Sequence, residues 1–138
     1  MFSMAVEFKA SLPKKEEFIG LHRTTGWNAE GLYTDNQLFQ AITNSWYAVS
    51  VYVNGELIAF GRIISDGIYQ TLICDVIVHP LYQKQGLGKR LVENLLEKCK
   101  EEDIKWVQLF SATGKQDFYK KIGFKERDFE APGMSIFL

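Results

Sequence analysis

The sequence of 138 residues is poor in the features that mark several protein classes. It has two cysteines, Cys74 and Cys99, with no CxxC pair and no cluster of histidines, so we predict reduced thiols and no metal site. No apolar run approaches the roughly 20 residues of a membrane-spanning helix. The N-terminus alternates apolar and charged residues, whereas a signal peptide needs an unbroken apolar stretch. We therefore expect a soluble, cytoplasmic protein that does not bind membranes.

An excess of charge of one sign is also absent. The chain has 16 Lys and Arg residues against 17 Asp and Glu residues, which gives a formal net charge of -1. This balance provides no strongly positive surface, so nucleic acid is not an expected partner. Hydrophobic residues make up 46% of the chain and aromatic residues 14%, which is enough for one buried core. Residues 1–138 are therefore predicted to form a single domain.

The apolar periodicity predicts a mixed α and β domain. The expected elements are a strand at 2–9, a helix that begins near Pro13, a helix at 35–44 capped by Thr34 or Asp35, strands at 46–53, 57–64 and 69–78, a helix at 87–100, a strand at 106–110, a helix at 116–122 and a last strand at 134–138. Asn54-Gly55 is typical of a two-residue hairpin turn, so the strands beside it should be antiparallel. The strand at 106–110 follows a long helix and should pair in parallel. His22 belongs to the apolar side of the first helix.

A glycine-bearing turn lies between the strand at 69–78 and the helix at 87–100. Gly86 and Gly88 let the backbone approach an anion without a Cβ in the way, and the free amides of the helix start carry partial positive charge. The spacing is not GxGxxG, no acidic ribose ligand follows, and the GK[ST] of a nucleotide-hydrolysing loop is missing, which disfavours a dinucleotide or ATP site. By itself, the turn predicts either a generic anion site or a simple helix start.

Two short motifs stand in a fixed order along the chain. The first is Gln83-x-x-Gly86-x-Gly88, and the second is Phe118-Tyr119-Lys120-Lys121-Ile122-Gly123-Phe124. The first resembles the Q/R-x-x-G-x-G/A signature of the GNAT superfamily of acetyltransferases, and the second resembles the FYxxxGF segment of the same family. The resemblance spans the whole chain. It implies the α+β fold of that family, in which a mostly antiparallel mixed sheet of about six or seven strands is flanked by about four helices.

The resemblance implies acetyl-CoA as the co-substrate, with its pyrophosphate on the glycine turn and its pantetheine arm along the strand at 69–78. The implied cofactor-binding residues are Val76, Ile77, Val78, Gln83, Lys84, Gln85, Gly86, Leu87, Gly88, Lys89 and Tyr119. A backbone N–H of Ile77 or Val78 would face the thioester carbonyl and stabilise the oxyanion. Family members often have an asparagine before the FY pair, where this chain has residues 111–115. A hydroxyl of Ser111 or Thr113 replaces that contact, or the contact is absent.

Tyr119 and Asp75 are the catalytic residues that we expect. The resemblance implies that Tyr119 is the general acid, since a phenol can protonate the departing thiolate. Its spacing alone is more typical of core packing. Asp75 stands in an otherwise apolar strand, where a carboxylate must find a partner or line a cleft, so it is either the general base or part of a structural hydrogen bond. His79 and bulk water are the other proton acceptors left open.

The expected acceptor is the primary amine of a small molecule, which would attack acetyl-CoA directly in a ternary complex. The residues expected to line the acceptor site are Trp27, Tyr33, Arg62 and Asp66. Two other functions stay open, which are a catalytically inactive sensor that binds acyl-CoA and an acetyltransferase for protein N-termini or lysines. The last strand, at 134–138, could pair between two subunits, which would give a homodimer, or it could pack within one chain.

Overall fold

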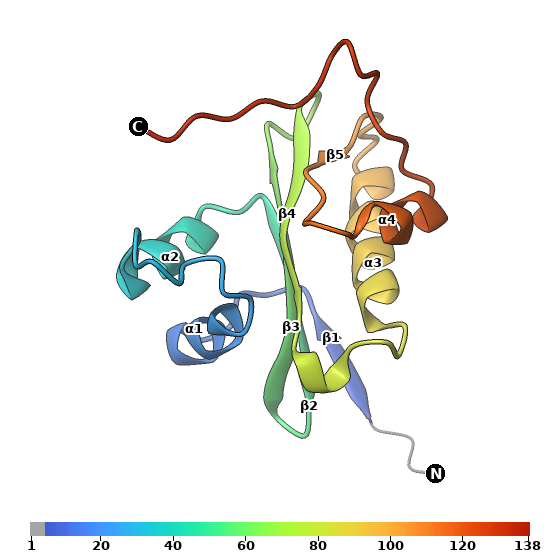
Figure 1. Ribbon diagram of the computed structural model, residues 1–138. Coiled ribbons are helices and arrows are strands. Elements are labelled where there is room, and N and C mark those ends of the chain that lie inside the picture. Colours follow the sequence, from blue (N-terminus) through green and yellow to red (C-terminus); the bar gives the residue numbers. More distant parts are fainter. Residues whose placement is uncertain (1–4) are drawn as a thin grey trace.

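A five-stranded mixed sheet forms the centre of the computed structural model, which describes residues 5–138 (Figure 1). The strands are β1 (Val6–Lys9), β2 (Tyr47–Val53), β3 (Glu56–Ser65), β4 (Thr71–Val78) and β5 (Gln108–Leu109). The helices are α1 (Lys15–Arg23), α2 (Asp35–Thr43), α3 (Leu87–Glu101) and α4 (Gln116–Ile122), with a short 3-10 turn η1 (Pro80–Tyr82). The strands lie in the order β1-β2-β3-β4-β5. Strands β1 to β4 pair with one another in antiparallel fashion, and β5 runs parallel to β4.

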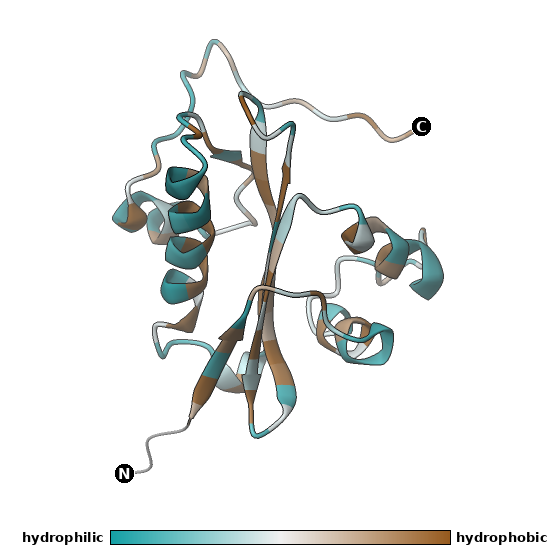
Figure 2. Ribbon diagram, turned by 180° about the vertical axis from the view of Figure 1, so that it is seen from behind, coloured by the Kyte–Doolittle hydropathy of each residue, from teal (hydrophilic) through white to brown (hydrophobic). Residues whose placement is uncertain are grey.

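The helices cover the sheet on both faces. Figure 1 shows α1 and α2 on one face and α3 and α4 on the other, and Figure 2 shows apolar residues along the strands between these layers. Each layer has its own buried cluster. The α3 side includes Val51, Ile58, Ile63, Leu91 and Leu95, and the α1 side includes Phe18, Ile42, Phe60 and Ile77. Within residues 5–138, no helix has the length and apolar character needed to cross a membrane.

Helix α3 packs closely on the sheet because its apolar residues form one stripe. Leu91, Val92 and Leu95 are fully buried, at the spacing that puts side chains on one face of a helix. A Cβ on Gly61 of β3 would lie 3.0 Å from Cδ1 of Leu95, so the glycine permits this close approach. The packing holds the first turn of α3 beside the end of β4, where the glycine turn lies.

Two local predictions are confirmed. Asn54 and Gly55 have φ values of 50° and 77°, the positive values that a type I′ hairpin turn requires. Thr34 caps α2, because its hydroxyl accepts from the Gln37 N–H at 3.1 Å and the Gln37 side chain accepts from the Thr34 N–H at 2.9 Å. Both features depend on residues close in sequence, which is why the sequence predicts them well.

The predicted α+β class is confirmed, whereas the expected number of strands is wrong. The described sheet has five strands, and residues 2–4 of the first expected strand lie outside the described residues. Strand β5 is limited to Gln108–Leu109, and residues 134–138 form no strand. Gly133 lies against the Phe110 ring, since a Cβ there would be 2.4 Å from Cε1 of that ring. The segment then runs away from the sheet edge (Figure 1), so it has no strand to pair with.

Candidate functional site

An extra residue in β4 shapes the middle of the sheet. Phe60 pairs with Ile77, and Arg62 pairs with Cys74, so β4 has one more residue than β3 between these pairs. Asp75 lies in this bulge with a φ of 53°, in the left-handed region that few residues other than glycine adopt. Ile73 packs in the α3-side cluster, so Cys74 points to the α1 side, and the bulge turns Asp75 to the same side.

Pairing between β4 and β5 ends just before this bulge. The paired residues are Leu72 with Gln108 and Ile73 with Leu109, and no pair follows them within the described chain. The remainder of β4 therefore has an edge that no strand of residues 5–138 occupies on the β5 side. The family resemblance implies a pantetheine arm along Val76, Ile77 and Val78, and this unpaired edge lies at those residues. Unpaired backbone N–H and C=O groups there can bond to the amides of such an arm.

Asp75 forms an ion pair with Arg62. Its Oδ2 lies 2.6 Å from Nε of Arg62, whose Nη1 also donates to the Ala41 carbonyl of α2 at 3.2 Å. The side chains are 26% and 11% exposed, so the pair is poorly screened by water. The structure thus joins the expected base to an expected acceptor-site residue, and one carboxylate oxygen of Asp75 is already bonded.

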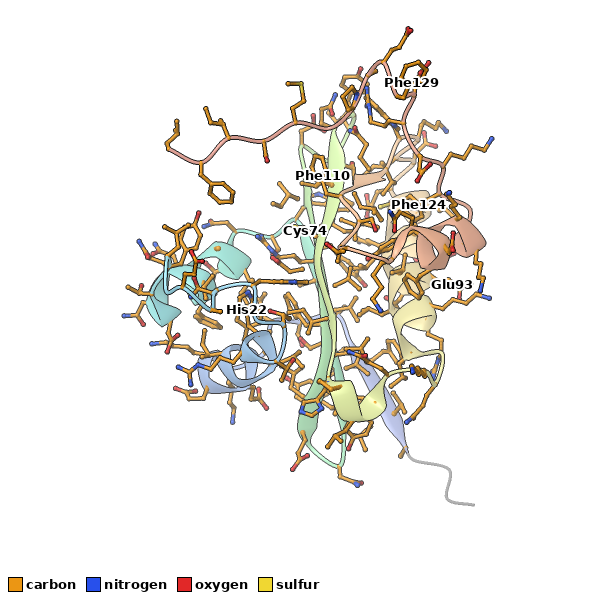
Figure 3. The ribbon with its side chains drawn as sticks, viewed as in Figure 1. His22, Cys74, Glu93, Phe110, Phe124 and Phe129 are labelled. Carbon is orange, nitrogen blue, oxygen red and sulfur yellow. The ribbon has the colours of Figure 1, made fainter. Side chains whose placement is uncertain are left out.

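His22 of α1 lies on the same side of the sheet, and the sequence did not single it out. The residue is 7% exposed, and its ring packs between Phe18 and Trp27 at centroid distances of 5.6 and 5.9 Å. Burial lowers the pKa of the imidazole below its ordinary value, and the negative charge of Asp75 opposes this shift. Figure 3 shows His22 on the α1 side of β4, the strand that carries Cys74. The only feature of the sequence that could have pointed to His22 is its place on the apolar side of the first helix.

The loop between α1 and α2 lies beside His22 and carries two expected acceptor-site residues. Trp27 and Tyr33 are about half exposed. The Asn28 side chain holds the loop, since it donates to the Tyr33 carbonyl at 2.8 Å and accepts from the Tyr33 N–H at 3.0 Å. A small cavity of about 160 Å³ lies between α1, this loop and α2, and His22 lines it. Trp27 is therefore close to His22, and both belong to the α1 side.

Asp66, the remaining expected acceptor-site residue, lies in the turn between β3 and β4. Its carboxylate accepts from the backbone N–H groups of Tyr69 at 2.7 Å, Ile68 at 2.9 Å and Gln70 at 3.2 Å. These bonds lower its pKa. The structure thus gives Asp66 a role in shaping the turn, four residues along the chain from Arg62.

The glycine turn leaves a row of backbone N–H groups free. Gln83 and Lys84 form a turn, and within residues 5–138 no hydrogen bond to a protein acceptor is found for the N–H groups of residues 86–89. Gly86 has a φ of 83°, which a glycine adopts without strain. The Gln83 side chain donates to the Val78 carbonyl at 2.9 Å and ties the turn to the end of β4. A Cβ on Gly88 would be 3.2 Å from the Phe118 ring, so this glycine lets α4 approach the turn.

Tyr119 lines a second, larger cavity of about 800 Å³ between β5, α4 and the C-terminal segment. Its ring packs edge-on against Phe118 and Phe124 at 4.9 and 5.9 Å, and burial raises the pKa of its phenol. Tyr119 therefore combines packing with access to a cavity.

Among the hydroxyls proposed to replace the missing asparagine, Ser111 donates to the Ala112 carbonyl at 2.8 Å. Figure 3 shows Phe124 on the α4 side of the sheet, opposite His22.

The arrangement has a match among known protein families. Residues 44–126 match the family model described as an acetyltransferase (GNAT) domain. An uncharacterized N-acetyltransferase, ycf52, from Gracilaria tenuistipitata var. liui is 38% identical over 88 residues, which cover 61% of this chain and 48% of that protein. The chain spans about half the length of the curated relatives that it matches.

Solved structures share the fold over nearly the whole chain. A probable acetyltransferase of unknown function from meticillin-resistant Staphylococcus aureus is 25% identical, with a TM-score of 0.86 over 97% of this chain and 100% of that chain. PaiA N-acetyltransferase from Thermoplasma acidophilum, solved in complex with coenzyme A, is 20% identical, with a TM-score of 0.72 over 91% of this chain and 92% of that chain. The second likeness concerns the fold alone.

Proposed function

The chain belongs to the GNAT family of acetyltransferases, and on that premise we propose that it transfers the acetyl group of acetyl-CoA to the primary amine of a small molecule. One observation carries the proposal. The free N–H groups of the glycine turn and the unpaired edge of β4 follow one another along the chain, and Tyr119 lines the cavity beyond β5. They could hold the pyrophosphate, the pantetheine arm and the departing sulfur in that order.

The proposed reaction is a direct transfer. The neutral amine nitrogen attacks the thioester carbonyl, a C–N bond forms, and the C–S bond breaks. The thiolate takes a proton from Tyr119, the nitrogen loses one proton to solvent, and the Tyr119 phenolate takes one up from solvent. A backbone N–H of Ile77 or Val78 stabilises the oxyanion. The state of the Cys74 thiol, which lies on the α1 side of β4, supports direct transfer. Burial raises the pKa of Cys74 to about 11, so the thiol is protonated at neutral pH and is a poor nucleophile for a covalent intermediate.

The acceptor site is proposed on the α1 side of the sheet. Trp27 and Tyr33 belong to the loop that covers this side, and the Arg62–Asp75 pair lies at the bulge beneath α2. The cavity beside the loop has a volume of about 160 Å³. A cavity of this size favours a small molecule as the acceptor rather than a folded protein. Cytoplasmic location stays a prediction.

We expect the wild-type chain to release free coenzyme A from acetyl-CoA in the presence of small primary amines. A thiol-detection assay over an amine panel, with peptides that present a free N-terminus or lysine as a parallel arm, measures this release. Initial rates at varied concentrations of both substrates should give intersecting lines, as direct transfer requires. Acetyl-CoA binding without thiol release would instead identify a sensor. Release with peptides alone would identify a protein acetyltransferase, and parallel lines would contradict direct transfer.

We expect Tyr119→Phe to lower kcat by about 100- to 10,000-fold, the usual contribution of a general acid. Burial raises the pKa of Tyr119, so the phenol stays protonated through neutral pH, and the alkaline decline of the wild-type rate should begin only at strongly alkaline pH. The variant should lack that alkaline decline. The matched control is Tyr52→Phe, which removes a phenol of β2 that is bonded to Glu17 of α1. A normal kcat for Tyr119→Phe at every pH would remove the acid role.

A homodimer is also proposed, through the C-terminal segment. Ile136 and Phe137 are 81% and 82% exposed, and apolar side chains so exposed favour a partner surface. The outer edge of β5 has no strand beside it in residues 5–138, and the 800 Å³ cavity lies along it. The segment 134–138 of a second copy could pair with that edge, and each copy would offer its segment to the other.

We expect light scattering after gel filtration to give the mass of two chains for the wild type. Phe137→Glu should give a single-chain mass, because a charge in the proposed apolar contact is costly to desolvate. Leu81→Glu changes a similarly exposed apolar residue on η1 and should leave the dimer mass unchanged. A single-chain mass for the wild type at all concentrations contradicts the dimer.

A further inference from the structure

His22 is a buried titratable group that the reaction above does not use. Its ring nitrogens have no hydrogen-bond partner within residues 5–138. No fully buried side-chain nitrogen or oxygen in those residues lacks a partner, so at least one ring nitrogen must be open to solvent. The small cavity between α1 and α2 offers that opening. A polar ring that is mostly buried yet reachable can exchange a proton with a ligand.

Charged side chains of four elements, α1, α2, β3 and β4, lie around His22. Asp75 of β4 is negative, but Arg62 of β3 binds it. Arg23 at the end of α1 is paired with Asp35 at the start of α2, at 2.9 Å. Both acidic groups near the ring are therefore already paired with arginine. No unpaired carboxylate holds a proton on the ring, and burial lowers its pKa, so the imidazole is neutral at neutral pH.

The two sides of the sheet separate the two proton transfers that acetylation needs. Tyr119 lies on the side of α3 and α4, where a thiolate could receive its proton. His22 lies on the side of α1 and α2, together with Trp27 and the bulge at Asp75. An amine that enters from the α1 side meets the carbonyl from the face opposite the acid. A base for the amine is thus needed on the side where His22 lies.

We propose that His22 accepts the proton that the acceptor's ammonium group must lose, an inference that rests on the proposed acetyl transfer. The ammonium N–H bond breaks, its proton moves to an imidazole nitrogen, and the neutral amine attacks the thioester. The nitrogen that has attacked loses a second proton to solvent as the amide forms. Tyr119 gives its proton to the thiolate and regains one from solvent. The imidazolium loses its proton to solvent through the small cavity. One proton is released per acetylated amine, and the wild-type chain regains its starting form.

Asp75 becomes a positioning residue in this scheme. Its Oδ2 is bonded to Arg62, and Arg62 is anchored on Ala41, so the carboxylate is fixed in place. Its negative charge stabilises the imidazolium that forms on His22, as a neighbouring carboxylate does for histidine bases in general. Asp75, which the sequence analysis expected to be the base, thus acts through His22.

The test is a pH profile of kcat with chemical rescue. We expect His22→Ala to lower kcat by about 100- to 10,000-fold, with the KM for acetyl-CoA unchanged, and to lose the acid-side decline of the wild type. Added imidazole should restore part of kcat, because it fits the space left by the side chain. Phe18→Ala is the matched control. It removes a neighbouring buried ring of the same helix, and it should keep the acid-side decline and gain nothing from imidazole.

Three outcomes overturn the inference while leaving acetyl transfer intact. They are an unchanged kcat for His22→Ala, an acid-side decline that persists in this variant, and a lack of rescue when the variant binds acetyl-CoA normally. A wild-type chain without turnover would overturn the proposed activity instead. The assignment is then decided by NMR of the His22 ring in the wild type. The expected midpoint lies below 6.5 and falls further in Asp75→Asn, whereas a ring that does not titrate contradicts it.

Discussion

One extra residue in β4 controls the geometry of the whole site. The bulge turns Asp75 to the α1 side, the side that Cys74 also faces, and β4 loses its β5 partner from that point onward. The left-handed conformation of Asp75 costs free energy, of the order of 1 kcal/mol for a residue other than glycine. The ion pair with Arg62 and the contact to α2 offset that cost. Strain of this kind gathers at functional sites.

Packing of α3 determines where the other half of the site lies. Its buried stripe and Gly61 hold the helix against β3 and β4, and the Gln83 side chain ties the turn to Val78. The free N–H groups of the turn therefore lie at the end of the strand whose edge is unpaired. A shift of α3 along the sheet would separate the turn from that edge, so core packing and the proposed cofactor site depend on the same contacts.

Features that depend on neighbours in sequence were predictable, and features that depend on distant residues were not. The Asn54-Gly55 turn and the Thr34 cap follow from local chemistry, and the glycine turn follows from its motif. The bulge depends on how β3 and β4 pair, which no short segment records. The role inferred for His22 requires α1 to pack against β4. The last expected strand failed for a similar reason, since a strand needs a partner edge that its own sequence does not specify.

The central claim is that the glycine turn and the unpaired edge of β4 form one continuous acetyl-CoA site. Amide hydrogen exchange of the wild-type chain, measured with and without saturating acetyl-CoA, tests it directly. The account predicts slower exchange in two segments, 76–78 and 83–89, because bound cofactor would cover the unpaired edge of β4 and the N–H groups of the glycine turn. Protection confined to other segments, or no protection at saturating acetyl-CoA, would contradict the claim.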